Sequence, residues 1–118
     1  MRALKKVLTI SGSVPTLIFD EIDQGVGGKT AFWIGEKLKV IASGRQIICV
    51  THLPQIASFA AHHYTITKKT EKDRTFTTIR KLDPDHRVEE IARLMSGSLQ
   101  TPASLAGARD MLERNAGP

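Results

Sequence analysis

The sequence lacks the features that define several protein classes. It has one cysteine, Cys49, so an intramolecular disulfide is impossible, and the apolar run around it predicts a small buried hydrophobe. No apolar run reaches the roughly 18 residues that a membrane helix needs. The first six residues also lack the apolar core of a signal peptide. These absences predict a cytoplasmic protein with no membrane partner.

What is present indicates one globular domain. The chain has 118 residues, of which 41% are hydrophobic and 25% charged, and this balance excludes a wholly disordered or collagenous chain. A domain takes roughly 100 to 200 residues, so two independent cores are not expected.

The net charge of +5 is concentrated in one segment. Between His63 and Leu82, two acidic residues stand against six basic ones: Lys68, Lys69, Lys72, Arg74, Arg80 and Lys81. Lysines that protect the edge of a solvated hairpin explain this excess without any ligand. The other explanation is contact with DNA or a partner protein, for which Lys68, Lys69, Lys72 and Arg74 are the candidate residues.

The apolar pattern predicts an α/β fold. Leu4, Val7 and Leu8 have the spacing of a helix face, whereas residues 16–19 form a continuous apolar run typical of a strand buried on both faces. A glycine-rich turn then precedes a predicted helix over 31–41, and a second strand is expected over 46–51. Strand, helix and strand make a βαβ unit with parallel strands.

The second half of the chain predicts a hairpin followed by helices. A short helix is expected after Pro54, and residues 64–69 and 75–82 are predicted strands around a turn at 70–74. Two more helices are expected, one around 88–95 and one capped by Thr101 with Pro102 in its first turn. The pattern contains no interdomain linker.

Two carboxylates directly follow the first apolar strand. At such a strand end Asp20 is suited to hold Mg²⁺ beside a phosphate, and Glu21 to act as general base toward water. Two solvated acids at a strand end are the alternative. The second strand ends in Thr51-His52, and ligands of parallel sheets gather at the carboxyl ends of strands, so His52 is predicted to face the same crevice.

Two other motifs are weaker candidates for a functional site. His62-His63 has no third ligand at zinc spacing, and we interpret the pair as structural. Gly28-Lys29-Thr30 resembles the end of a phosphate-binding loop, but the first glycine of that pattern falls on Asp23, whose charge would repel phosphate. The chain is therefore predicted to have metal and water-activating groups without a phosphate cradle.

Three segments carry a family resemblance that covers most of the chain: Pro15 to Asp23, Gly25 to Gly28, and Val50 to Ala57. They resemble the C-terminal ATPase segment of the RecN family of bacterial DNA repair proteins, which is related to the SMC family. The Thr-His-Leu-Pro-Gln-Ile-Ala run is the most specific of the three, because many ATPases share the strand with two carboxylates.

The resemblance implies a P-loop NTPase fold of the ABC type that uses ATP and Mg²⁺. It makes Asp20 the Walker B aspartate, Glu21 the catalytic glutamate and His52 the switch histidine. It also assigns a nucleotide-contacting D-loop region, whose residues here are Asp23, Gly25, Gly27 and Gly28. Gly27 stands where many ABC proteins have the D-loop aspartate, so that contact is not transferred.

The resemblance also implies partners. In the family the Walker A lysine, the Q-loop, the signature motif and the coiled coil precede the position of Met1, so residues 1–118 correspond to the C-terminal part of a head. We expect the chain to need the N-terminal half of the head, and a second head in a head-to-tail dimer, before it hydrolyses ATP. DNA would be bound by the assembled protein, in the bacterial cytoplasm at the nucleoid.

Two other hypotheses are compatible with the sequence. The chain could be a catalytically inactive basic module that binds DNA or a partner protein through its hairpin. It could also be a metal-dependent phosphoesterase that uses Asp20, Glu21 and Asp23, although two-metal chemistry needs carboxylates from further elements.

Overall fold

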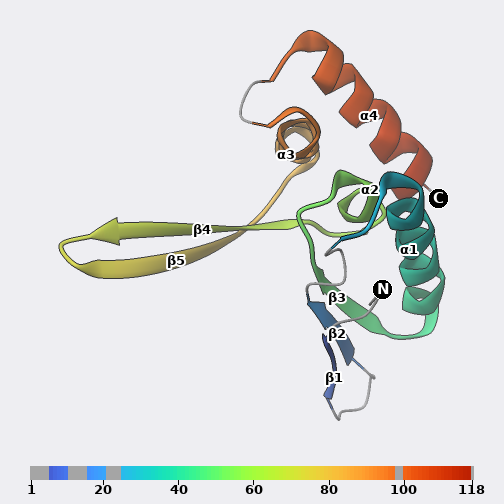
Figure 1. Cartoon of the computed structure of the whole chain (residues 1–118), viewed down its shortest axis with the longest axis horizontal. Helices are drawn as coiled ribbons and strands as arrows, with labels where there is room; N and C mark the ends of the chain where they lie inside the picture. Colours follow the sequence, from blue (N-terminus) through green and yellow to red (C-terminus); the bar gives the residue numbers. More distant parts are fainter. Residues whose placement is uncertain (1–5, 11–15, 21–24, 98–99, 118) are drawn as a thin grey trace.

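The computed structural model describes residues 6–10, 16–20, 25–97 and 100–117. Its elements, in chain order, are β1 (Lys6–Ile10), β2 (Thr16–Asp20), α1 (Gly28–Ile41), the short 3₁₀ helix η1 (Ala42–Gly44), β3 (Gln46–Val50), α2 (Pro54–Ala57), β4 (Tyr64–Glu71), β5 (Arg74–Lys81), α3 (Pro84–Ser96) and α4 (Pro102–Ala116). Figure 1 shows a small sheet beside α1, a pair of C-terminal helices, and a hairpin that projects away from both.

The sheet has the strand order β1-β2-β3. β2 and β3 are parallel and α1 connects them, so the βαβ prediction is confirmed. The helix predicted from Leu4, Val7 and Leu8 is wrong. Residues 6–10 form a strand antiparallel to β2, and Leu4 lies outside the described residues. Five backbone pairings with β2 outweigh a helical spacing that spans little more than one turn and has no capping residue.

Burial in the sheet is one-sided. Ile47 and Cys49 of β3 pack against the core, whereas Ile48 and Val50 on the opposite face are 44% and 46% exposed. Ile18 of β2 is only half-buried. The expectation that residues 16–19 form a strand buried on both faces is therefore wrong, since Phe19 is the one fully buried residue of β2. The described part of the chain also leaves the face of β3 that carries Ile48 and Val50 open to solvent.

The first core cluster joins the sheet to two helices. Phe19 of β2 packs with Ala31 and Ile34 of α1 and with Ile56 of α2, and all four side chains are buried. Phe59, just after α2, meets Phe32 edge to face, with ring centroids 6.1 Å apart. This contact is possible because Gly35 of α1 has no side chain between the two segments.

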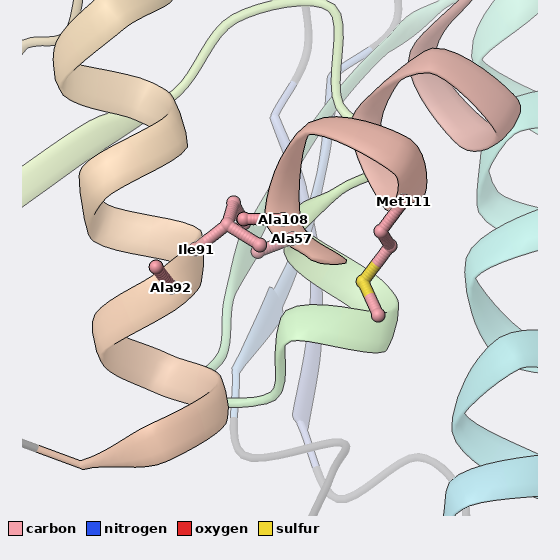
Figure 2. Packing of buried hydrophobic residues seen from close by; sticks show 5 residues of the cluster. All are labelled: Ala57, Ile91, Ala92, Ala108 and Met111. Atoms are coloured by element: carbon pink, nitrogen blue, oxygen red, sulfur yellow. The ribbon is translucent and has the colours of Figure 1, made fainter. Parts of the chain in front are cut away.

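The second core cluster joins α2 to the C-terminal helices. Ala57 of α2 packs with Ile91 and Ala92 of α3 and with Ala108 and Met111 of α4 (Figure 2). Polar contacts strengthen the same junction. Asn115 of α4 donates a hydrogen bond to the buried Ser58 hydroxyl (2.9 Å), and Arg87 of α3 donates to the carbonyl of Ala57 (3.1 Å) and to that of Ala60.

Local caps fix the two C-terminal helices. The Asp83 carboxylate accepts a hydrogen bond from the His86 backbone N–H (2.8 Å) at the start of α3. Thr101 and Ser104 form a reciprocal capping box at the start of α4, which confirms the cap predicted for this helix. None of the helices in the described segments combines the length and the hydropathy that a membrane span requires.

The hairpin is longer than predicted. β4 and β5 pair in register from Tyr64 with Lys81 to Glu71 with Arg74, so the connection has two residues in place of the expected five. Lys72 and Asp73 both have positive φ, 46° and 62°. Short hairpin turns need this conformation because it matches the twist of the strands. The predicted turn was too long because neither position is glycine.

The close approach of Phe59 to α1 gives a stability prediction. A Cβ on Gly35 would stand 2.3 Å from Phe59 Cδ2 and 3.1 Å from the Gln55 carbonyl oxygen, so we expect Gly35→Ala to lower the free energy of unfolding by about 1–3 kcal/mol. Gly44→Ala is the matched control, because no atom lies within 4 Å of its Cβ position. Urea unfolding of both variants tests this, and equal stabilities would contradict the packing described.

Candidate functional site

Two strand ends meet at one edge of the sheet. In the parallel register Asp20, the last residue of β2, is level with Val50, the last residue of β3. Thr51 and His52 follow directly, so the structure places the Asp20 carboxylate and the Thr51-His52 segment at the same carboxyl-end edge. Asp20 is half-buried and His52 is exposed. Glu21 and Asp23, the other predicted acidic site residues, lie outside the described residues.

The bend that carries His52 is fixed at both ends. On one side, the Leu53 N–H donates a hydrogen bond to the Thr51 hydroxyl (3.1 Å). On the other, the Leu53 carbonyl accepts from the N–H groups of Ile56 and Ala57, which start α2. Pro54 is buried at the first helical position, where a backbone N–H would have no hydrogen-bond partner within the helix. The backbone at His52 is therefore held between a strand and a helix.

The glycine turn after β2 leads into the N-terminus of α1. Gly25 has φ of +70°, a conformation that favours glycine, and Gly27 is the N-cap of α1 in an extended conformation. Gly28 is the first helical residue. Among the described residues no side chain caps this N-terminus, and its first turn has no acidic residue, so its N–H groups carry a partial positive charge.

Gln55 is a residue of this region that the sequence patterns did not identify. Its Nε2 lies 3.9 Å from the position that a Cβ on Gly28 would occupy, so its side chain connects the segment after His52 to the start of α1. Its Oε1 is buried and has no hydrogen-bond partner among the described residues. The only sequence signal for Gln55 is its position inside the Thr51–Ala57 run.

The described residues contain no cluster of side chains that would hold a metal ion by itself. Across residues 6–10, 16–20, 25–97 and 100–117, no group of three His, Cys, Asp or Glu side chains is arranged to hold a metal ion. Asp20 is the carboxylate that this part of the chain offers at the sheet edge.

The predicted basic contact residues lie on a different element. Lys68, Lys69, Lys72 and Arg74 are all exposed in the outer half of the β4–β5 hairpin, which forms a sheet of its own. Figure 1 shows this hairpin pointing away from the three-stranded sheet. The structure therefore separates the basic residues from the edge that carries Asp20 and His52.

A cavity of about 560 Å³ lies between the base of the hairpin, α3 and α4, lined by residues that include His63, Leu82, Arg87 and Leu112. The His63 side chain is partly buried, and its Nδ1 has no hydrogen-bond partner among the described residues. Burial lowers the pKa of His63 below its usual value, and the positive charge of Arg87 lowers it further, while Glu90 acts in the opposite direction.

Comparison with known proteins identifies relatives of one kind. No protein-family model matches the chain. It is 44% identical over 112 residues to the DNA repair protein RecN of Deinococcus radiodurans, 40% over 116 residues to that of Treponema pallidum, and 36% over 114 residues to that of Bacillus subtilis. These matches cover 94%, 98% and 97% of the chain, and the chain spans about a fifth of the length of each relative. The matched part is their C-terminal segment, which confirms the resemblance to RecN.

The lowered pKa of His63 predicts a pH dependence of stability. Between the folded pKa and the unfolded value near 6.5 the unfolded chain binds more protons, so stability is fully present above pH 6.5 and falls as the pH drops below it. His63→Gln should flatten the dependence measured by urea unfolding between pH 7.5 and 5. The exposed neighbour offers a control, His62→Gln, which should keep the wild-type slope. An unchanged slope in His63→Gln would refute the assignment.

Proposed function

We propose that this chain, a relative of the C-terminal segment of RecN proteins, contributes one part of an ATP-hydrolysing site in a bacterial DNA repair protein. The observation that carries the proposal is the shared sheet edge: Asp20 ends β2 in register with the end of β3, from which Thr51-His52 continues. An acidic group and an imidazole that arrive from neighbouring parallel strands are suited to a nucleotide at a topological crevice.

Asp20 is the residue proposed to hold Mg²⁺. Magnesium in nucleotide sites takes one or two protein carboxylates together with phosphate oxygens and waters, so a single half-buried carboxylate at this edge fits it. When bound with ATP, the ion neutralises charge on the phosphates. The N-terminus of α1 begins at the glycine turn, has no side-chain cap among the described residues, and adds a partial positive charge that suits an anionic ligand.

Glu21 and His52 are proposed to act on water and phosphate. Glu21 follows Asp20 directly in the sequence, and in this proposal its carboxylate accepts the proton of the attacking water. His52 is exposed at the strand end, where a ring N–H can donate to a phosphate oxygen. The glycine turn that includes Gly25, Gly27 and Gly28, and with it Asp23, completes the nucleotide-contacting segment.

The proposal requires partner segments that supply the phosphate-binding groups. In a P-loop NTPase head of the ABC type, these come from an N-terminal half and from a second head bound head to tail. The open apolar face of β3, with Ile48 and Val50 exposed, supports a covering partner, because parallel strands are normally buried on both faces. DNA recombination at the nucleoid, in the bacterial cytoplasm, is the setting that this assignment implies.

The test is reconstitution of ATP hydrolysis. The chain is mixed with the N-terminal four-fifths of a RecN relative, and Mg-ATP hydrolysis is measured for the mixture and for each part alone. We expect activity only in the mixture. Glu21→Gln should lower kcat at least ~100-fold, because general-base catalysis contributes about 10² to 10⁴.

The matched control is Glu36→Gln, which removes an exposed carboxylate from α1 away from the sheet edge. It should leave the rate within twofold of the wild type. A mixture in which both variants hydrolyse ATP at the same rate would overturn the proposal. Hydrolysis by the chain alone would show that Gly28-Lys29-Thr30 acts as a phosphate-binding loop after all.

A further inference from the structure

The β4–β5 hairpin is an arm without a packing partner in the described structure. Every residue from 66 to 81 is exposed, although both strands are fully paired with each other over eight residues. Eight residues of antiparallel strand span about 27 Å at 3.4 Å per residue. Figure 1 shows the arm extending away from the helices and the three-stranded sheet. A two-stranded ribbon exposed on both faces is suited to contact another molecule along its length.

The register divides the arm into two chemically different halves. The inner half, next to the body, has an apolar face on which Tyr64, Ile66 and Ile79 are 54%, 56% and 66% exposed. The outer half has four basic residues and two acidic ones within residues 68–77. The outer half also presents exposed hydroxyls from Thr70, Thr75 and Thr77.

The cations of the outer half are available to a ligand. Lys68, Lys69, Lys72 and Arg74 form no ion pair within the described residues, whereas Arg93 and Arg114 elsewhere pair with carboxylates of their own helices. Glu71 lies opposite Arg74 in register but forms no ion pair with it. The four basic side chains of residues 68–77 exceed the two acidic ones, so the outer half of this narrow ribbon carries a net positive charge.

We propose that the outer half of this arm binds the sugar-phosphate backbone of duplex DNA. The major groove of B-DNA, about 12 Å wide, admits a two-stranded ribbon, and lysine, arginine and threonine are typical phosphate contacts. Contacts to phosphate and sugar carry no sequence information, so this binding is independent of the DNA sequence. The inference does not rest on the proposed ATP site, because backbone binding needs no nucleotide.

The test measures how binding depends on salt. A fluorescent 20-bp duplex is titrated with the chain, without nucleotide, at several NaCl concentrations between 50 and 200 mM. A protein that neutralises Z phosphates gives a slope of log affinity against log salt of about −0.9Z. Replacement of Lys68, Lys69, Lys72 and Arg74 by Gln should reduce the steepness by up to ~3.6 and weaken binding at 50 mM at least tenfold.

A matched control removes the same number of positive charges elsewhere, at Lys37, Arg45, Arg109 and Arg114. It should keep more than half of the wild-type slope, because these exposed residues lie outside the arm. A conservative variant in which Lys68, Lys69 and Lys72 become Arg should bind like the wild type. This variant shows that a loss in the Gln variant comes from charge and not from an unfolded hairpin.

Two outcomes would overturn the proposal. In the first, the arm variant and the control lose equal affinity, which would make binding a property of net charge alone. In the second, the arm variant binds DNA with the affinity and salt slope of the wild type. The arm would then take no part in DNA binding, and its lysines would serve only to protect the strand edges.

Discussion

The packing of Phe19 against Ala31, Ile34 and Ile56 is the contact on which the candidate site depends. Each of the three elements in this cluster presents a site residue a short distance along the chain from its buried one. Asp20 follows Phe19, Gly28 precedes Ala31 by three residues, and Gln55 precedes Ile56. Because the buried members fix the end of β2, the start of α1 and α2 together, the polar residues at the sheet edge take their positions from the core.

α2 couples this edge to the rest of the molecule although it has only four residues. Ile56 belongs to the first cluster and Ala57 to the second, so one turn of helix joins the sheet to α3 and α4. The Ser58 to Asn115 hydrogen bond and the contacts of Arg87 reinforce this joint. The hairpin leaves from the same region without packing on either cluster. The molecule thus separates a site held by the core from an arm that is free to reach another molecule.

Patterns that depend on near neighbours in the sequence predicted most of the fold. The βαβ unit, the hairpin, the capped last helix and the shared edge of Asp20 and His52 follow from apolar runs, glycines and caps. The first strand was predicted as a helix because the spacing of Leu4, Val7 and Leu8 covers about one turn, and only pairing with β2 decides between the two states.

The remaining features depend on contacts between distant segments. Ile48 and Val50 are exposed because no described segment covers their face of the sheet. The sequence of β3 alone does not show whether another segment packs on that face. The proximity of Gln55 to Gly28 arises from the packing of α2 on α1 and has no local signature.

The most direct test of the account locates a nucleotide-bound metal. ATP with Mn²⁺ in place of Mg²⁺ is added to the ¹⁵N-labelled chain in complex with the N-terminal portion of a RecN relative, and paramagnetic broadening of amide signals is recorded. We expect the signals of Asp20, His52 and Gly28 to broaden first, while those of the β4–β5 arm remain sharp. Broadening centred on any other element, with the sheet-edge signals unchanged, would contradict it.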